Sequence, residues 1–158
     1  MTDAVATLVA RHRLEPHPEG GFYRETYRSQ STVRDPLTGG IRSASTAILF
    51  LLTPDSHSAF HRLRSDEIWH FYEGDSITLH FLGRGGSAPE IILGHERPQA
   101  VVLAGVWQAA ECSGERYSLC GCTVAPGFEF EDFELGPREV LLAEFPRCRR
   151  LIEAFTSG

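Results

Sequence analysis

The sequence predicts an all-β protein folded as an antiparallel sandwich or barrel. About eight or nine short β-rich segments follow one another, with turn residues roughly every 8–12 positions. The 15 glycines and nine prolines are scattered along the 158 residues, which is typical of a chain with many turns. Helical periodicity is convincing only near the N-terminus, and a second helical pattern lies at the C-terminal end.

The N-terminal segment 3–14, DAVATLVARHRL, predicts a short amphipathic helix. Val5 and Leu8 fall on one stripe at helical spacing, and Thr2 or Asp3 can act as the N-cap. The prolines that follow end the helix, because proline supplies no backbone N–H and disfavours a helical residue before it.

The strands begin after a Gly-Gly pair. Residues 22–29, FYRETYRS, alternate in chemistry with period two, and residues 45–53, STAILFLLT, predict a strand buried on both faces. Residues 30–43 between them are expected to form a loop. Further strands are predicted at SAFHRL, DEIWHFYE, SITLHFLG, EIILG, QAVVLAG, YSLCGCTV and EFEDFELG.

The C-terminal segment LLAEFPRCRRLIEAF predicts a helix after Pro146, with Leu151, Ile152 and Phe155 facing inward. Composition shows no internal boundary, so residues 1–158 are expected to form one domain.

Composition and charge exclude several classes of partner. A net charge of −6 and a pI near 5.6 argue against a nucleic-acid polymer, whose phosphates require a basic surface. The longest apolar run, residues 47–52, is far shorter than the roughly 20 residues that cross a bilayer, so no membrane partner is expected. The N-terminus lacks the order of a signal peptide, and the four cysteines are expected to be free thiols in the cytoplasm.

Residues 60–75, FHRLRSDEIWHFYEGD, concentrate histidine, charge and aromatic rings in one stretch. A metal site needs three or four converging ligands. Glu67 and His70 are three residues apart on one predicted strand and therefore face opposite ways, whereas His61 and Glu67 can converge from neighbouring strands. Two ligands do not complete a metal site, so the spacing disfavours one.

Several of these residues match a known family. His61, Glu67 and Gly74 fit the first cupin motif, and VVLAGVWQAA at 101–110 looks like the second. The blocks PHPEGGFYRETYRS and FLLTPDSHSAFHRLRSDEIWHFYEGD resemble the cupin-5 subfamily, whose activities are mostly unassigned, over roughly residues 8–145. The resemblance implies a cupin jelly-roll barrel, or double-stranded β-helix, with a ligand cavity inside and a homodimeric assembly.

The chain departs from the general cupin metal motif at several positions. Phe60 and Arg62 stand where the motif places its paired histidines, Gln108 takes the place of the last histidine, and Leu103 replaces a proline. An amide oxygen is a poor ligand for a transition metal. No cofactor is therefore expected and a divalent metal is disfavoured. Within the cupin superfamily the chain distantly resembles the sugar-nucleotide epimerases, and this resemblance implies chemistry without a metal.

His61 and Glu67 are the candidate catalytic residues. A histidine with an ordinary pKa near 6.5 can accept or donate a proton at neutral pH, so His61 is the expected base. Under strict alternation Glu67 would share the cavity face with Trp69 and Phe71, and desolvation there would raise its pKa, as a general acid requires. The alternatives are a surface histidine on an edge strand for His61, and a rim ion pair with a nearby arginine for Glu67.

Arg24, Trp69, His80, Trp107 and Gln108 are the candidate ligand-binding residues. Arg24 can pair with an anionic group, the two tryptophans offer flat faces for stacking, and Gln108 can orient a ligand. His80 reaches the cavity only if the preceding hairpin has an even loop length, so whether it or His70 faces inward stays open. The alternatives are a surface salt bridge for Arg24 and core packing for the tryptophans.

Three functions are consistent with these residues. The first is a barrel that binds a small polar molecule, such as a sugar or nucleotide derivative, with epimerase or isomerase proton transfer. The second is a metal-dependent cupin enzyme, a dioxygenase or an isomerase. The third is a non-catalytic binding module or structural dimer.

Overall fold

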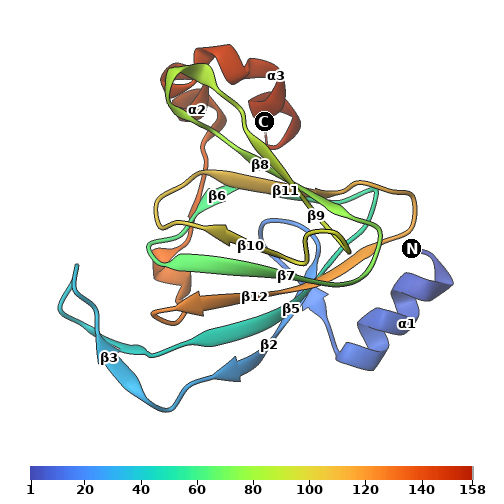
Figure 1. The fold of residues 1–158 in the computed structure, drawn as a ribbon, viewed down its shortest axis with the longest axis horizontal. Coiled ribbons are helices and arrows are strands. Elements are labelled where there is room, and N and C mark those ends of the chain that lie inside the picture. Colours follow the sequence, from blue (N-terminus) through green and yellow to red (C-terminus); the bar gives the residue numbers. More distant parts are fainter. Residues whose placement is uncertain (158) are drawn as a thin grey trace.

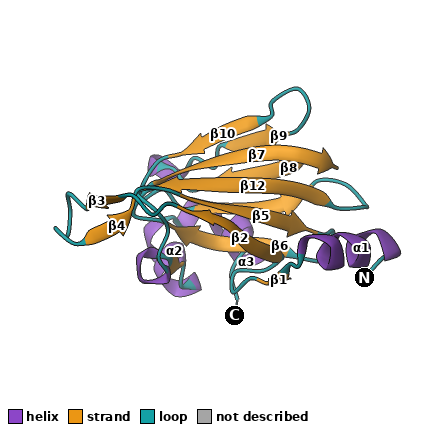
Figure 2. Ribbon diagram, turned by 90° about the horizontal axis from the view of Figure 1, so that it is seen from below, coloured by secondary structure: helices purple, strands orange, loops and turns teal. Residues whose placement is uncertain are grey.

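The computed structural model describes residues 1–157 and consists of two antiparallel sheets packed face to face, with helices outside them (Figure 1, Figure 2). The six-stranded sheet has the order β1-β2-β5-β12-β7-β10, and the five-stranded sheet has the order β13-β6-β11-β8-β9. The strands of the first are β1 (Glu15–Pro16), β2 (Phe22–Arg28), β5 (Thr46–Leu52), β12 (Ser118–Ala125), β7 (Asp66–Gly74) and β10 (Gln99–Val102). Those of the second are β13 (Glu134–Leu135), β6 (His57–Arg62), β11 (Gln108–Cys112), β8 (Ile77–Phe81) and β9 (Glu90–Leu93).

The predicted all-β fold is therefore confirmed, but the loop expected at residues 30–43 is wrong. β3 (Thr32–Arg34) and β4 (Ile41–Ser43) form a separate two-stranded hairpin that projects from the body (Figure 2). Its turn is organised by Asp35, whose carboxylate accepts a hydrogen bond of 2.8 Å from the Leu37 N–H. The turn residues 35–40 connect the two strands of a hairpin, because the short segments on either side, β3 and β4, pair with each other.

The helices are few and lie on the outside. The α-helices are α1 (Asp3–His12), α2 (Arg138–Glu144) and α3 (Arg149–Ala154). Three single turns of 3₁₀-helix complete the set: η1 (Arg84–Gly86), η2 (Phe130–Asp132) and η3 (Pro146–Cys148). No helix within residues 1–157 is long and apolar enough to cross a membrane.

The predicted N-terminal helix is confirmed. Thr2 is its N-cap, with the Thr2 hydroxyl accepting from the Val5 N–H. Val5 and Leu8 pack against Leu51 and Leu119 on the outer face of the six-stranded sheet. This contact explains why β5 is apolar on both faces.

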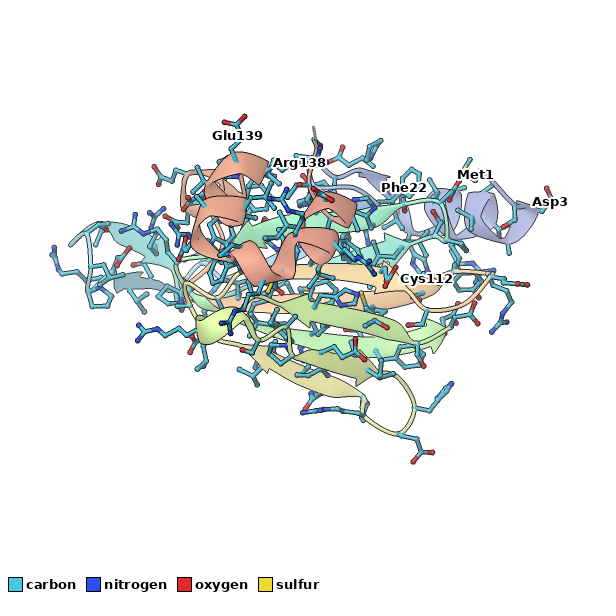
Figure 3. All side chains as sticks on the ribbon, turned by 90° about the horizontal axis from the view of Figure 1, so that it is seen from above. Met1, Asp3, Phe22, Cys112, Arg138 and Glu139 are labelled. Atoms are coloured by element: carbon cyan, nitrogen blue, oxygen red, sulfur yellow. The ribbon has the colours of Figure 1, made fainter. Side chains whose placement is uncertain are left out.

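The C-terminal helices cover the outer face of the five-stranded sheet, as Figure 3 shows from above. The predicted helix after Pro146 is confirmed as α3, and α2 before it was not anticipated. Leu141 and Ile152 from these helices pack against Phe60 and Trp107 of the sheet. Arg138, at the start of α2, ties the two helices together by hydrogen bonds to Thr156.

The main core lies between the two sheets. In β7 the side chains alternate as period two requires, so Glu67, Trp69 and Phe71 are buried inside while Ile68 and Tyr72 face outward. Trp69 meets Phe50 of β5 edge to face at 5.8 Å. At one end this core opens into a cavity.

Candidate functional site

A cavity of about 130 Å³ lies between the sheets. Its wall comes mainly from the inner face of the six-stranded sheet, and His61 of β6 together with residues from segments 15–19 and 128–133 completes it. The lining side chains are Glu15, His17, Glu19, Tyr23, Glu25, Arg28, Thr46, Ile48, Phe50, His61, Leu63, Glu67, Trp69, Cys122, Val124, Phe128, Glu129, Phe130 and Phe133.

Strand register explains why residues distant in the chain share this wall. Directly paired residues on antiparallel strands point to the same face. Glu67 is paired with Val124, and Val124 with Thr46. A bulge in β2 then brings Arg28, paired with Thr46, onto the cavity face.

His61 and Glu19 form a buried pair at the inner end of the cavity. The Nδ1–H of His61 donates to the Ala59 carbonyl at 2.8 Å, and Glu19 Oε2 lies 2.9 Å from the same nitrogen. The side chains are 3% and 7% exposed, so this ion pair is shielded from water. The His61 ring also stacks on Phe133, with centroids 5.3 Å apart.

The turn that contains Glu19 is held in place by β6. The Glu19 carbonyl accepts a hydrogen bond of 2.9 Å from the Ala59 N–H, and the Glu19 N–H donates to His17 Nδ1 at 3.1 Å. Gly20 follows with φ +110°, and a Cβ there would collide with the His57 carbonyl. The sequence PHPEGG therefore positions a carboxylate, a role that sequence reasoning missed.

Glu67 is held by a second buried network. Gln108 Nε2 donates to Glu67 Oε2 at 2.6 Å, and Trp69 Nε1 donates to Gln108 Oε1 at 3.0 Å. All three side chains are buried. Because the amide uses its nitrogen on one partner and its oxygen on the other, it fixes the orientation of the carboxylate and of the indole.

Burial and charge shift the pKa values of these groups in different directions. Burial is the largest single influence on His61 and lowers its pKa, but the charge and hydrogen bond of Glu19, the charge of Glu67 and the hydrogen bond to Ala59 together outweigh it and raise this pKa to about 9. Burial tends to raise the pKa of Glu19, but His61 pulls it below its ordinary value. Burial raises the pKa of Glu67 and lowers that of His17. The inner cavity thus holds an imidazolium–carboxylate pair next to the carboxyl group of Glu67, whose raised pKa disfavours ionisation.

The opening of the cavity is lined by the segment that follows β12. Phe128, Phe130 and Phe133 face it, and Phe130 is 50% exposed. Arg28 secures the segment by donating to Glu129 at 2.8 Å and to the Phe128 carbonyl at 2.8 Å. The predicted strand EFEDFELG is confirmed only at β13 (Glu134–Leu135). The residues before β13 form η2, and their phenylalanines line the cavity.

Comparison with known proteins identifies the family. The Cupin_5 family model, described as Cupin superfamily (DUF985), matches residues 6–136. The chain belongs to the Cupin_5 family. The uncharacterized protein YML079W of Saccharomyces cerevisiae is 32% identical over 153 residues, which cover 79% of this chain and 71% of the yeast protein.

Solved structures support the same assignment. A hypothetical protein from Leishmania major superposes with a TM-score of 0.90 at 30% identity, covering 97% of this chain and 98% of that one. Protein SO0799 from Shewanella oneidensis gives a TM-score of 0.88 at 37% identity, with 100% and 99% covered. Oxalate decarboxylase from Bacillus subtilis gives a TM-score of 0.57 at 16% identity over 89% of this chain and 36% of that one, which shows the shared cupin fold alone.

The donor set of this Cupin_5 protein does not fit a cupin metal. His61 can offer only its Nε2, because Nδ1 is used by Ala59 and Glu19, and both ends of the Gln108 amide are committed to Glu67 and Trp69. Within residues 1–157, no group of three or more His, Cys, Asp or Glu side chains is arranged to hold a metal ion. Transition metals need three or four convergent donors, and this cavity offers a pre-formed ion pair in their place.

Three of the sequence-predicted residues line the cavity, and a fourth, Gln108, is hydrogen-bonded to two of them. His61, Glu67 and Trp69 are in the wall, and Gln108 bonds to the last two. His70 lies on the outer face, where its ring nitrogens contact Thr123 at 3.0 Å and Gln99 at 3.1 Å.

His80 and Trp107 are placed elsewhere, which corrects the expectation that they face the cavity. β7 and β8 belong to different sheets and do not form a hairpin, so the length of the loop between them does not decide which way His80 points. His80 points outward between buried Leu79 and Phe81 and lies 4.8 Å from the Phe155 ring, beneath the C-terminal helices. Trp107 is buried under the same helices, with the Arg62 guanidinium 4.4 Å from its ring centroid.

Arg24 also lies away from the cavity. It alternates with Tyr23 and Glu25, which face inward, so it points to the outer side of β2. Its Nε is buried without a hydrogen-bond partner among residues 1–157.

Sequence reasoning missed Glu19, Arg28 and the phenylalanines of segment 128–133. One signal could have pointed to Glu19: a Gly-Gly pair next to a lone carboxylate suggests a turn held against another backbone. No local signal identifies Phe130, because an exposed phenylalanine in a loop resembles any other surface residue.

Proposed function

We propose that the cavity binds a small hydroxy-carbonyl compound, such as a sugar derivative, and moves a proton on the carbon next to its carbonyl group. The observation that supports this most is that Glu67 and the His61–Glu19 pair line one cavity with their pKa values shifted in different directions. Two titratable groups tuned apart in this way are suited to act as base and acid.

The directions of the pKa shifts suggest which group plays which part. His61 with a pKa of about 9 is protonated at neutral pH and can donate a hydrogen bond, and then a proton, to a carbonyl oxygen. Because its Nδ1 is used by Glu19 and Ala59, Nε2 is the atom available to a ligand. This reverses the role of base expected from the sequence.

Glu67 in its ionised form is then the base. Its raised pKa makes it a stronger base than an ordinary carboxylate, and Gln108 holds it in one orientation. Glu67 would take the proton from the carbon while His61 stabilises the enolate oxygen. Return of a proton to that carbon, or to its neighbour, gives an epimer or an isomer, and both protons are restored to their donors.

Solvent exchange is the direct test. The protein is incubated in D₂O with a panel of neutral aldoses, ketoses and their deoxy derivatives, and loss of the proton next to the carbonyl is followed by NMR. We expect exchange with at least one of these compounds, and a loss of about 10²–10⁴-fold in Glu67→Gln, the usual contribution of an acid–base residue. His80→Gln is the matched control, because His80 also has a carboxylate partner but lies outside the cavity.

Binding without any exchange in the wild-type protein would favour a non-catalytic module, and full activity in Glu67→Gln would refute the proposed role of this residue.

A homodimer is the assembly we propose, because the outer face of the six-stranded sheet exposes large apolar side chains. Ile68, paired with Val101, is exposed there together with Tyr72, and contiguous apolar patches of this kind mark interfaces. Val101→Asp is expected to convert the dimer to a monomer in light scattering. A wild-type monomer at all concentrations would contradict this assembly.

A further inference from the structure

The cavity carries more negative than positive charge. Its charged lining residues are Glu15, Glu19, Glu25, Glu67 and Glu129 against Arg28 and His61. Burial lowers the pKa of His17, so this ring adds no positive charge at neutral pH. A concave site lined by one sign of charge concentrates ligands of the opposite sign, and the net charge of −6 on the chain adds to the effect.

The one arginine of the wall has its donors directed to the protein. Arg28 donates through Nε and Nη2 to Glu25 at 2.9 and 2.8 Å, through Nη1 to Glu129 at 2.8 Å, and through Nη2 to the Phe128 carbonyl at 2.8 Å. A phosphate or carboxylate is bound by arginine donors that are free to form a fork around it. The geometry therefore disfavours an anionic ligand, which includes the nucleotide derivatives suggested by the sequence.

The inner cavity also contains an acceptor with unused capacity. The Glu19 side chain is only 7% exposed, and its Oε2 accepts no aligned hydrogen bond from any residue of the described chain, although His61 Nδ1 lies 2.9 Å away. A buried carboxylate oxygen in this state favours a ligand that brings a proton donor or a positive charge.

Aromatic rings line the opening next to these carboxylates. Phe128 and Phe130 meet edge to face at 5.0 Å and 81°, and His17 meets Tyr23 at 4.5 Å and 78°. Phe130 is 50% exposed at the rim. Aromatic rings that line a cavity next to carboxylates provide the surroundings in which proteins bind organic ammonium groups.

We infer that the ligand of this cavity is an organic cation, with an ammonium group at the mouth between the phenylalanine rings and the carboxylates. This inference rests on the proposed function in one respect, which is that the ammonium group and the reacting carbonyl group occupy the same cavity. The rings of Phe128 and Phe130 contact the substituents of the ammonium. Glu15 supplies opposite charge, together with the surplus negative charge of Glu25 and Glu129 over their single partner Arg28. The hydroxyl end of the ligand extends inward to Glu67 and His61.

Choline and its uncharged carbon analogue, in which a tert-butyl group replaces the trimethylammonium, separate charge from shape. Binding of each to the full chain is measured by two-dimensional amide NMR titration. We expect choline to shift the amide signals of segment 128–133 and to bind roughly tenfold more tightly than the analogue, a factor within reach of one cation–aromatic contact plus the charge of the rim. Choline affinity should fall as salt is added, because the rim is open to solvent.

Two variants of exposed residues test the mouth without risk to the fold. Phe130→Ala is expected to weaken choline about three- to tenfold, and Glu15→Gln about threefold, with little change for the neutral analogue. Glu131→Gln is the matched control, because Glu131 belongs to the same segment but pairs with Arg42 and lies outside the cavity lining.

Equal affinity for choline and the analogue, or no choline-dependent shift in segment 128–133, would overturn the inference. Neither result depends on catalysis, so the exchange experiment with neutral compounds would still decide the proposed proton transfer. A neutral sugar that exchanges in D₂O while choline fails to bind would refute the cation and leave the proton transfer supported.

Discussion

Two histidine–glutamate pairs of this protein have the same contact distance but different surroundings. His61 and Glu19 lie 2.9 Å apart inside the cavity with side chains 3% and 7% exposed. His80 and Glu111 also lie 2.9 Å apart, beneath the C-terminal helices, with side chains 11% and 45% exposed. Contact distance is therefore not what distinguishes a candidate acid–base group from a structural pair.

The difference lies in what else is buried with each pair. Glu19 cannot be solvated when His61 loses its proton, so the two charges depend on each other and the pKa of His61 rises to about 9. Glu111 remains half in water, where ion pairs contribute little. The inner pair also faces a cavity and a second carboxyl group, whereas the outer pair faces Phe155.

The largest effect is expected from removing one partner of the inner pair. Glu19→Gln leaves a buried imidazolium without its counter-charge, which typically costs about 3–5 kcal/mol. Glu111→Gln should cost about 0–1 kcal/mol, because its pair is solvated. Urea unfolding of the two variants measures both values, and equal costs would contradict the distinction between the pairs.

The pH dependence of stability should show the same contrast. The pKa of His61 is raised from 6.5 to about 9, so its contribution is fully present below pH 6.5 and is lost as the pH rises through about 9. A shift of this size corresponds to about 3 kcal/mol. The raised pKa of Glu67 acts in the same direction, since a carboxyl group that binds its proton more tightly when folded loses stability as the pH rises.

Urea midpoints measured from neutral to alkaline pH test this prediction. The fall of the urea midpoint with rising pH should be smaller in His61→Gln, because the contribution of His61 is then missing. It should be the same as in the wild type in His80→Gln. A decline of the same size in all three proteins would show that other groups cause it.

How far these two regions could be predicted from sequence follows from the range of the interactions. Period-two alternation within β7 correctly predicted that Glu67, Trp69 and Phe71 share the inner face, because that rule depends only on neighbouring residues. The place of His80 could not be derived in the same way. It depends on β7 and β8 belonging to different sheets, which no local pattern encodes.

Glu19 and Phe130 escaped prediction for a related reason. Each lies in a turn whose position is set by contacts with strands far away in the chain: Glu19 with β6, and segment 128–133 with Arg28. The sequence PHPEGG indicates a turn, but only the packing of that turn on Ala59 turns its carboxylate toward His61. Residue type suggested the chemistry of the site, and topology decided which residues supply it.

A smaller effect for each buried group is expected from Gln108→Leu. The substitution leaves the Trp69 N–H and the Glu67 carboxyl group without their buried partner, at a cost of about 1–3 kcal/mol for each group. Denaturant unfolding gives the size, and the control is Gln99→Leu, whose amide bonds to His70 at 3.1 Å on the outer face. A cost no greater than that of Gln99→Leu would mean that the network does not hold Glu67.

The smallest effect on stability is expected from Glu67→Gln. An amide keeps the size of the side chain and removes the penalty of ionising a buried acid, so the free energy of unfolding should change by less than about 1 kcal/mol. Loss of proton exchange with retained stability would separate a chemical role from a structural one. A large loss of stability would instead assign Glu67 to the framework.

The proposed chemistry depends most on His61 being held as an imidazolium by Glu19 within the cavity. NMR titration of the His61 ring, followed through its carbon-bound proton in the wild-type protein and in Glu19→Gln, measures this directly. We expect a pKa of about 9 in the wild type and a clear fall in the variant. A wild-type pKa at or below the ordinary value of 6.5, or one that Glu19→Gln leaves unchanged, would contradict it.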